Sequence, residues 1–225
     1  MTLNGQAPHA SGGPFRTGVI DPPWPYKKVT TTGNNLSGYV EYIHADETRT
    51  EYRTLTIADL RSLPVGELIS GYAFLWCPNP FLPAGLGLLE AWGFQYATAI
   101  HWRKTTKLGK VTYGAGFWYR GAVETILVAK KPGVKSIRTH QRNVFDALRP
   151  PGHSTKPEEF QDHIEEHFPG PYVELFARRV RPGWTCLGDE CPGDMQDIRV
   201  SLPEVLKPKP IARVIKRRRT TQTAV

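Results

Sequence analysis

Apolar positions along the chain form short continuous runs that alternate with longer amphipathic stretches, the pattern of strands alternating with helices. Six apolar runs predict strands, at residues 18–20, 72–76, 96–102, 123–129, 172–177 and 184–187. Three amphipathic stretches predict helices, at residues 56–63, 83–92 and 157–168. Buried strands that alternate with helices are typical of an α/β sandwich, in which helices cover both faces of a mostly parallel sheet. Ligands of such sheets bind at the carboxyl ends of the strands.

Polar segments rich in glycine, proline and threonine separate and flank these elements. We expect flexible or irregular chain in five of them, at residues 1–15, 27–53, 103–121, 131–155 and 207–225. Residues 16–206 would then form the folded domain. A domain of this size buries enough surface to fold without a disulfide or a metal.

Composition narrows the class of protein. Aromatic residues make up 11% of the chain, which excludes an intrinsically disordered protein. No apolar run approaches the roughly 18 residues of a membrane span, and the start of the chain lacks the basic-then-apolar pattern of a secretory leader. We therefore expect no membrane association. Three cysteines are too few for a disulfide scaffold and predict a reducing compartment, the cytoplasm: Cys77, Cys186 and Cys191.

The net charge of +8 is concentrated near the C-terminus. Seven basic residues and no acidic one lie between Lys207 and Arg219, which leaves 22 basic against 21 acidic residues elsewhere. This basic tail is either an arm that binds phosphate backbones or a solvated, solubilising terminus. The charge pattern alone does not separate the two interpretations.

The sequence Asp21-Pro22-Pro23-Trp24 directly follows the first apolar run. It places a carboxylate at the end of a strand, and Pro23 has no N–H to compete for the Pro22 carbonyl. An adenine-like base could stack on Trp24 and donate its two amino hydrogens to Asp21 and to that carbonyl. Two fixed acceptors would localise the nitrogen lone pair and stabilise the charge that develops as the nitrogen attacks carbon, which is worth ~10²–10³ in rate per group. The alternative is a structural turn, with Trp24 covering the edge of the core.

This turn and further segments resemble the MT-A70 family, the adenine-N(6) methyltransferases that act on nucleic acids. The matching segments run in order from about Ile20 to Glu190. Besides Asp21–Trp24, they lie at residues 52–55, 63–65, 75–80, 93–94, 102, 114–124, 153–157, 174–178 and 183–188.

The resemblance implies a Rossmann-like methyltransferase fold with S-adenosylmethionine as the methyl donor. Its motif order is permuted, so that the catalytic half precedes the cofactor half. Asp21, Pro22, Pro23 and Trp24 would form the target-adenine site, close to the methionyl part of the cofactor. Lys156 would reach the carboxylate of the cofactor. The other cofactor-binding residues that the resemblance implies are Glu174, Arg178, Gly188, Asp189 and Glu190.

Two departures limit the match. The family commonly has an amide where this chain has Asp189, and a carboxylate can accept hydrogen bonds there but cannot donate them. The loop after Phe176 is not rich in glycine. The absence of G-x-G-x-x-G argues against a standard nicotinamide-dependent enzyme more than against this family.

Residues 101–121 contain five cations and five aromatic residues but no acid. Interleaved cations and rings suit a nucleic-acid strand, because phosphates meet the cations and bases stack on the rings. The alternative is a surface loop whose rings cover the edge of the core. A duplex target would have to be flipped out of the stack, at a cost of a few kcal/mol. The residues predicted to bind nucleic acid are Tyr26, Lys27, Arg103, Lys104 and Arg120.

The segment His163 to His167 fits the H-x-x-E-H pattern of some zinc peptidases. Both histidines would share one helix face, as zinc ligation requires. They lie beside the apolar stripe of Phe160, Ile164 and Phe168, among acidic residues typical of a solvated helix face. We therefore predict no metal site.

Together these features predict an S-adenosylmethionine-dependent methyltransferase that acts on the 6-amino group of adenine in nucleic acid, with DNA favoured over RNA. Two alternatives stay open: a non-catalytic nucleic-acid-binding subunit with the same fold, and an RNA adenosine methyltransferase. The intact Asp21–Trp24 turn and Lys156 argue against the first. The sequence has no obvious separate target-recognition domain, which predicts modest specificity or a partner in a homo- or heterodimer.

Overall fold

The computed structural model describes residues 13–25, 54–114, 118–151 and 155–207. The loop predicted at residues 27–53 lies outside the described residues, as do nearly all of the predicted N-terminal segment and basic tail. The same holds for Tyr26 and Lys27, two of the residues predicted to bind nucleic acid.

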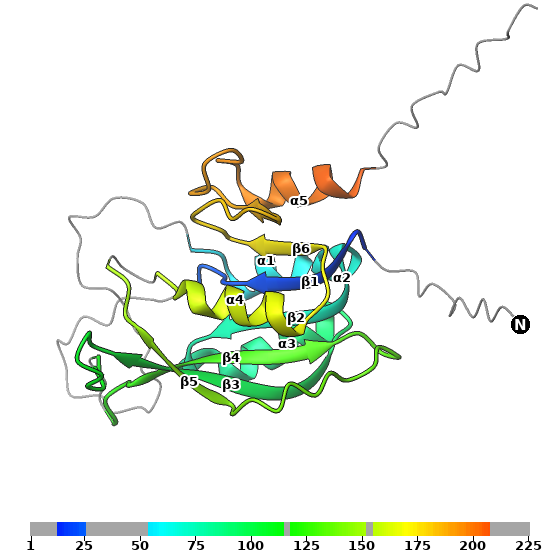
Figure 1. Ribbon diagram of the computed structural model, residues 1–225. Coiled ribbons are helices and arrows are strands. Elements are labelled where there is room, and N and C mark those ends of the chain that lie inside the picture. Colours follow the sequence, from blue (N-terminus) through cyan, green and yellow to red (C-terminus); the bar gives the residue numbers. More distant parts are fainter. Residues whose placement is uncertain (1–12, 26–53, 115–117, 152–154, 208–225) are drawn as a thin grey trace, which may run out of the picture.

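Seven strands form one sheet in the order β5-β3-β4-β2-β1-β6-β7 (Figure 1). Every neighbouring pair is parallel except the two pairs that contain β4, which runs antiparallel to both β2 and β3. The predicted mostly parallel sheet is thus confirmed. The strands are β1 (Phe15–Ile20), β2 (Ile69–Cys77), β3 (Gln95–Thr105), β4 (Val123–Lys130), β5 (Val144–Leu148), β6 (Tyr172–Leu175) and β7 (Trp184–Leu187).

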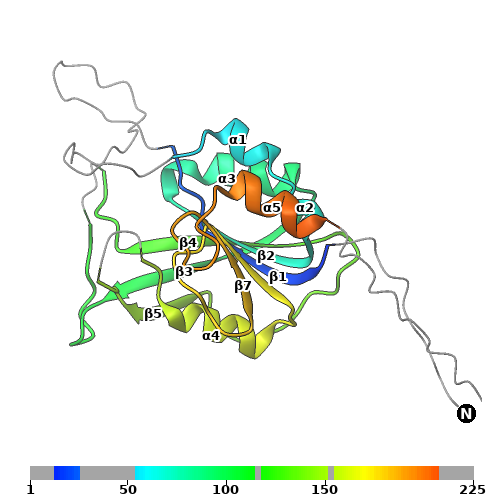
Figure 2. The same cartoon turned by 90° about the horizontal axis from the view of Figure 1, so that it is seen from above.

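Helices cover both faces of the sheet, as Figure 2 shows. On one face lie α1 (Ile57–Ser62), α2 (Val65–Leu68), α3 (Leu82–Ala91) and α5 (Ile198–Leu206), and on the other lies α4 (Glu158–His167). A 3-10 turn, η1 (Asn79–Phe81), leads into α3. None of the helices among the described residues is long and apolar enough to cross a membrane.

Successive residues of the central strand β2 supply two separate cores, because side chains along a strand point alternately to opposite faces. Ala73 and Leu75 belong to the core under α1, α2, α3 and α5. Phe74 and Trp76 belong to the core under α4, together with Phe160 and Ile164 of that helix. Burial on both sides explains why the strand is apolar almost throughout.

Most of the predicted elements are present with bounds that shift by a few residues. β1 begins at Phe15, one residue inside the segment predicted to be flexible. Four elements were not predicted: the short helix α2, the 3-10 turn η1, strand β5 and helix α5. Strand β5 lies in the segment predicted to be irregular, because it is an edge strand whose residues are mostly exposed and carry no apolar run. No helix was predicted at the position of α5, which contains Pro203, a residue that disfavours the interior of a helix.

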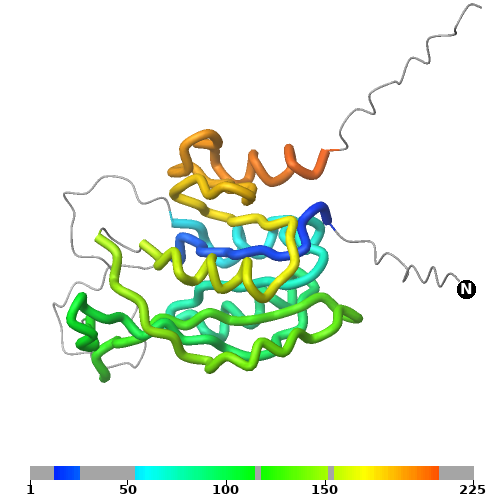
Figure 3. The backbone as a smooth tube through the Cα atoms, in the orientation of Figure 1, coloured from blue at the N-terminus to red at the C-terminus, as the bar shows by residue number. Residues whose placement is uncertain are grey.

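The sheet changes direction between β1 and β6. From β1 the chain builds outward through β2, whereas β6 and β7 return to the other side of β1. Figure 3 shows β1 in blue beside β6 in yellow, although they are far apart in the sequence. The Asp21 N–H donates to the Leu175 carbonyl (3.3 Å) where both strands end. Such a switch point is where α/β sheets bind ligands.

Helix α1 ties the chain to the turn that follows β1. The Leu55 N–H donates to the Pro23 carbonyl (3.0 Å). Thr56 then starts the helix with a capping box: its side-chain oxygen accepts from the Asp59 N–H (3.1 Å), and the Asp59 carboxylate accepts from the Thr56 N–H (3.1 Å). The cap fixes the direction in which the chain leaves the turn.

Replacing Thr56 with alanine should lower the free energy of unfolding by about 1 kcal/mol, since the Asp59 N–H loses its acceptor. Thr56→Ser keeps the oxygen and should stay close to the wild type. Urea denaturation of the three proteins measures the difference. Equal stability of Thr56→Ala and Thr56→Ser would contradict the role of the cap.

Candidate active site

Backbone hydrogen bonds hold the turn after β1: one within the turn itself, and others to β6 and to the residue before Thr56. Pro22 and Pro23 end the strand, and the Pro22 carbonyl accepts the N–H of Trp24 (2.9 Å). The sequence excluded only a competing N–H from Pro23, and proline has none. The Trp24 N–H is a donor that the sequence did not reveal; it occupies one lone pair and leaves the second for another donor. Asp21, at the carboxyl end of β1, directly precedes Pro22 in the chain.

Trp24 differs from the prediction in its placement. Its side chain is 4% exposed, its indole N–H donates to the Trp76 carbonyl (3.0 Å), and its ring stacks on Phe81 with centroids 5.1 Å apart. Packing in the core satisfies both the apolar ring and the single polar atom of tryptophan. The arrangement described here therefore does not present Trp24 as an open platform for a base. It fixes the turn from which Asp21 extends.

A chain of alternating charges surrounds Asp21. The Lys156 ammonium lies 2.9 Å from Asp21 Oδ2 and 3.5 Å from Glu124 Oε2, and Lys104 Nζ lies 2.6 Å from Glu124 Oε1. All four side chains are mostly buried. Lys156 also lies 5.2 Å from the centroid of the Trp76 ring. Lys156 lies two residues before the start of α4, Glu124 is the second residue of β4 and Lys104 is on β3, so with Asp21 after β1 the cluster joins four parts of the fold.

The electrostatic environment sets the charge of each group. Burial raises the pKa of Asp21, and the nearby Lys156 offsets only part of that rise. Burial alone would lower the pKa of Lys156, but Asp21 and Glu124 together raise it. Burial would likewise raise the pKa of Glu124, but Lys156 and Lys104 together lower it. Lys156 therefore stays cationic at neutral pH, and Glu124 stays anionic.

Sequence analysis assigned no role to Glu124. It included the residue only as the end of a matching segment, and the one local signal is an acid at the start of an apolar strand after a long stretch without acids. Lys104 was predicted to bind nucleic acid, but its ammonium is directed inward to Glu124. Arg103 is at the surface and forms a two-pronged ion pair with Asp146, with N–O distances of 2.6 and 2.5 Å. Arg120 is exposed.

Four of the residues predicted to bind the cofactor, Arg178, Gly188, Asp189 and Glu190, lie in the segments that follow β6 and β7. Arg178 Nε lies 3.5 Å from Glu190 Oε2, and both Glu190 and Asp189 are exposed. Gly188 has no room for a side chain, because a Cβ there would lie 2.5 Å from the Ala177 carbonyl oxygen. The two loops that follow β6 and β7 therefore pack backbone to backbone.

Glu174 sits deeper in the same region. Burial raises its pKa to about 7. Its carboxylate accepts from the side-chain amide of Gln161 (2.5 Å), and the amide oxygen of Gln161 accepts from Arg179 Nη2 (2.6 Å). Gln161 lies on α4 and is 3% exposed, so its hydrogen bond to Glu174 links α4 to β6 inside the protein. Sequence analysis did not single out Gln161.

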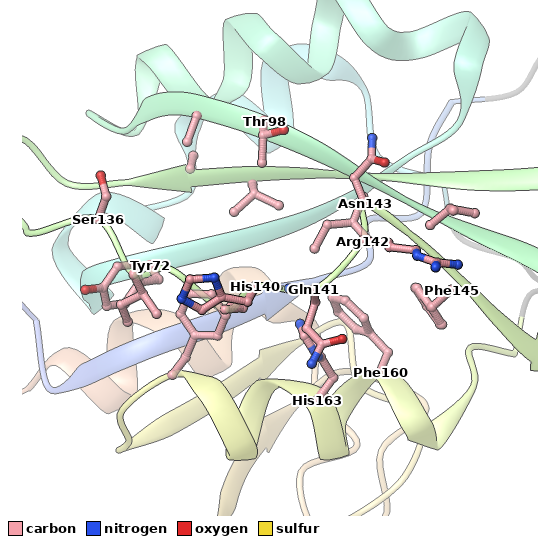
Figure 4. Close-up of a pocket in the computed structure, with 18 of the residues that line it drawn as sticks. Tyr72, Thr98, Ser136, His140, Gln141, Arg142, Asn143, Phe145, Phe160 and His163 are labelled. Atoms are coloured by element: carbon pink, nitrogen blue, oxygen red, sulfur yellow. Dashed lines mark hydrogen bonds between the residues drawn. The ribbon is translucent and has the colours of Figure 1, made fainter.

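A cavity of about 570 Å³ lies away from these residues, between α4 and the first half of β3 (Figure 4). His140, Arg142 and His163 line it beside Phe145 and Phe160. None of the predicted catalytic or cofactor-binding residues does. His163 and His167, which fit the zinc pattern, have ring centroids 4.5 Å apart. No group of three metal-binding side chains occurs among the described residues.

Comparison with known proteins identifies the family. The MT-A70 family matches residues 15–190. Type II methyltransferase M.MunI of a Mycoplasma species is 31% identical over 79% of this chain and 78% of its own length. The human N(6)-adenosine-methyltransferase catalytic subunit METTL3 is 30% identical over 80% of this chain, and the N6-methyladenosine RNA methyltransferase MTA1 of Cryphonectria parasitica is 28% identical over 76%.

The chain spans 29% of METTL3 and 50% of that MTA1. The family match covers the sheet from β1 to β7 together with the Asp21 turn, Glu124, Lys156 and the ends of β6 and β7. The resemblance noted in the sequence is thus confirmed over the whole of the candidate site, and the chain belongs to the MT-A70 family.

Proposed function

We propose that this protein transfers a methyl group from S-adenosylmethionine to the 6-amino group of adenine in DNA. The observation that carries the proposal is the Asp21 carboxylate, which lies at the sheet's switch point, 2.9 Å from Lys156. The next residue, Pro22, has a carbonyl that accepts one hydrogen bond from the described residues. METTL3 and MTA1 carry N(6)-adenosine and N6-methyladenosine in their names, which supports adenine N(6) as the methylated position here.

Asp21 and the Pro22 carbonyl are two acceptors on adjacent residues of the turn. The 6-amino nitrogen of adenine is a poor nucleophile because its lone pair is delocalised into the ring. Hydrogen bonds to two fixed acceptors would keep the lone pair on nitrogen and stabilise the positive charge that develops during transfer. Asp21 must be ionised to act in this way. Lys156 favours its ionised form, and the surrounding burial opposes it.

The residues at the ends of β6 and β7 fit S-adenosylmethionine. The absence of room for a Cβ at Gly188 is typical of a loop built for close backbone approach, and Asp189 and Glu190 are exposed carboxylates suited to accepting ribose hydroxyls. The Lys156 ammonium would bind the carboxylate of the methionyl part. When bound, the cofactor supplies a methyl group on a sulfonium sulfur. The protein aligns the adenine nitrogen with the methyl group, and holding these two reactants close together is its main catalytic effect.

DNA is the proposed substrate because the Mycoplasma type II methyltransferase is matched over most of both chains. The matches to METTL3 and MTA1 keep RNA as the second candidate. A non-catalytic subunit is the third, and the buried Asp21–Lys156–Glu124 cluster argues against it. A scaffold gains little from such a cluster, since well-packed apolar residues are often as stable as a buried ion pair.

Methyl transfer to oligonucleotides of one sequence, prepared as DNA and as RNA, distinguishes the first two candidates. We expect the higher kcat/KM on DNA. A higher kcat/KM on RNA would assign the protein to the RNA branch instead. A non-catalytic subunit would show no transfer to either, and no heat when S-adenosylmethionine is titrated into it.

Asp21→Asn keeps the size of the side chain but removes its negative charge. We expect kcat to fall by about 10²–10³ because the developing charge on the adenine nitrogen loses its stabilisation. Cofactor affinity, measured by isothermal titration, should stay largely intact. Full activity in the variant would refute the role of Asp21, whereas loss of cofactor binding would mean that Asp21 also contacts the methionyl group.

Glu124→Gln should move the acid limb of the pH profile. The negative charge of Glu124 raises the pKa of Asp21, so its removal lowers that pKa and leaves Lys156 more fully paired with Asp21. Since activity is lost as the pH falls through the pKa of Asp21, the acid limb of kcat/KM should shift to lower pH. Glu204→Gln, at a surface acid that pairs with Lys207, is the matched control. A shift to higher pH, or none, contradicts the assignment.

A further inference from the structure

The connection between β3 and β4 exposes an unusual amount of apolar surface. We define the β3–β4 lobe as residues 106–114 and 118–122, the described part of this connection. Trp118 is 85% exposed, Tyr119 is 89% exposed and Tyr113 is 69% exposed. Large rings are seldom left this open on a soluble domain unless the surface binds something.

The lobe rises directly from the candidate active site. The Lys104 N–H donates to the Ala122 carbonyl (3.1 Å), and the Gly114 N–H donates to the Gly121 carbonyl (2.9 Å), so the two legs of the lobe are joined at its base. Lys104 and Glu124 flank that base and form the outer part of the charge cluster around Asp21. A nucleotide with its base at Asp21 would therefore have its neighbours beside the lobe.

The charge of the lobe favours a polyanion as its partner. Lys107, Lys110 and Arg120 are exposed on it, and no acidic residue occurs between His101 and Gly121. A protein-binding loop usually gains specificity from mixed charges. Exposed rings interleaved with cations are the composition of a surface that stacks on bases and contacts phosphates.

A duplex target presents a specific physical problem. Adenine must leave the base stack to reach Asp21, and the lost pairing and stacking cost a few kcal/mol. Aromatic or apolar side chains that enter the duplex restore part of the stacking, at ~1–3 kcal/mol per base. Trp118 and Tyr119 are adjacent and exposed, and the base of their lobe adjoins the charge cluster around Asp21.

We propose that Trp118 and Tyr119 form a wedge that enters the duplex at the target and stacks on the bases beside the vacated position. The inference rests on the proposed function, and it explains how a paired adenine becomes accessible to Asp21. The wedge stabilises the flipped-out state and makes no contact with the reacting nitrogen. Its effect should therefore depend on whether the target is paired.

Trp118→Ala tests this on three DNA substrates of one sequence. These are a paired duplex, the same duplex with an abasic site opposite the target adenine, and the single strand. We expect kcat/KM to fall about tenfold or more on the paired duplex. It should change little on the other two, because their adenine is already unstacked or unpaired. Trp118→Phe should recover most of the loss, since phenylalanine retains a stacking face.

Tyr96→Ala is the matched control, because Tyr96 is 49% exposed on the first half of β3, away from the lobe. It should leave all three substrates unchanged. The fluorescence of 2-aminopurine at the target position gives a second readout. It should rise when the wild type binds the duplex, and rise less with Trp118→Ala.

Four results would overturn the wedge. They are an equal loss on all three substrates, no loss on any, a wild type that methylates only single strands, and a loss that accompanies a change in molecular mass in solution. The last would show that the lobe binds a protein. In each case the wild type still methylates adenine, so the proposed function stands. Failure of the wild type on every substrate would instead reject the proposed function itself.

Discussion

The Lys156 ammonium lies between two carboxylates, 2.9 Å from Asp21 and 3.5 Å from Glu124. Two anions beside one buried cation raise the pKa of Lys156 and keep it charged, and of the two carboxyl groups only Asp21 has a pKa that is raised by its surroundings. Asp21 follows β1, Glu124 lies at the start of β4 and Lys156 lies two residues before α4, so the cluster exists only when the sheet and α4 are in place. Removal of the Lys156 charge would leave the buried Asp21 carboxylate without its ion-pair partner, and such a loss typically costs about 3–5 kcal/mol.

Much of the fold could be predicted because its central strands are buried on both faces. The runs that became β2, β4 and β6 are apolar almost throughout, and periodicity detects such strands directly. Periodicity does not give strand direction, so the antiparallel orientation of β4 could not be predicted. β5 escaped notice because an edge strand carries little apolar signal, and α5 because of its internal proline.

The site was predicted less completely than the fold. Asp21 and Lys156 were found from their motifs, and in the structure their side chains form a direct ion pair. Glu124 was missed because one acid at the start of a strand looks like an ordinary solvated residue. Residue type alone did not reveal that the Trp24 ring packs inward on Phe81 or that Lys104 is bound to Glu124. Both facts depend on contacts between residues far apart in the sequence.

The central claim is that one turn positions the adenine nitrogen by two acceptors while the ends of β6 and β7 hold the methyl donor. A crystal structure with a bisubstrate analogue, in which adenine N6 is linked to an S-adenosylmethionine mimic, tests this most directly. We expect N6 within hydrogen-bond distance of Asp21 and the Pro22 carbonyl, with the mimic against Gly188 and Lys156. An analogue bound elsewhere, such as in the cavity between α4 and β3, would contradict it.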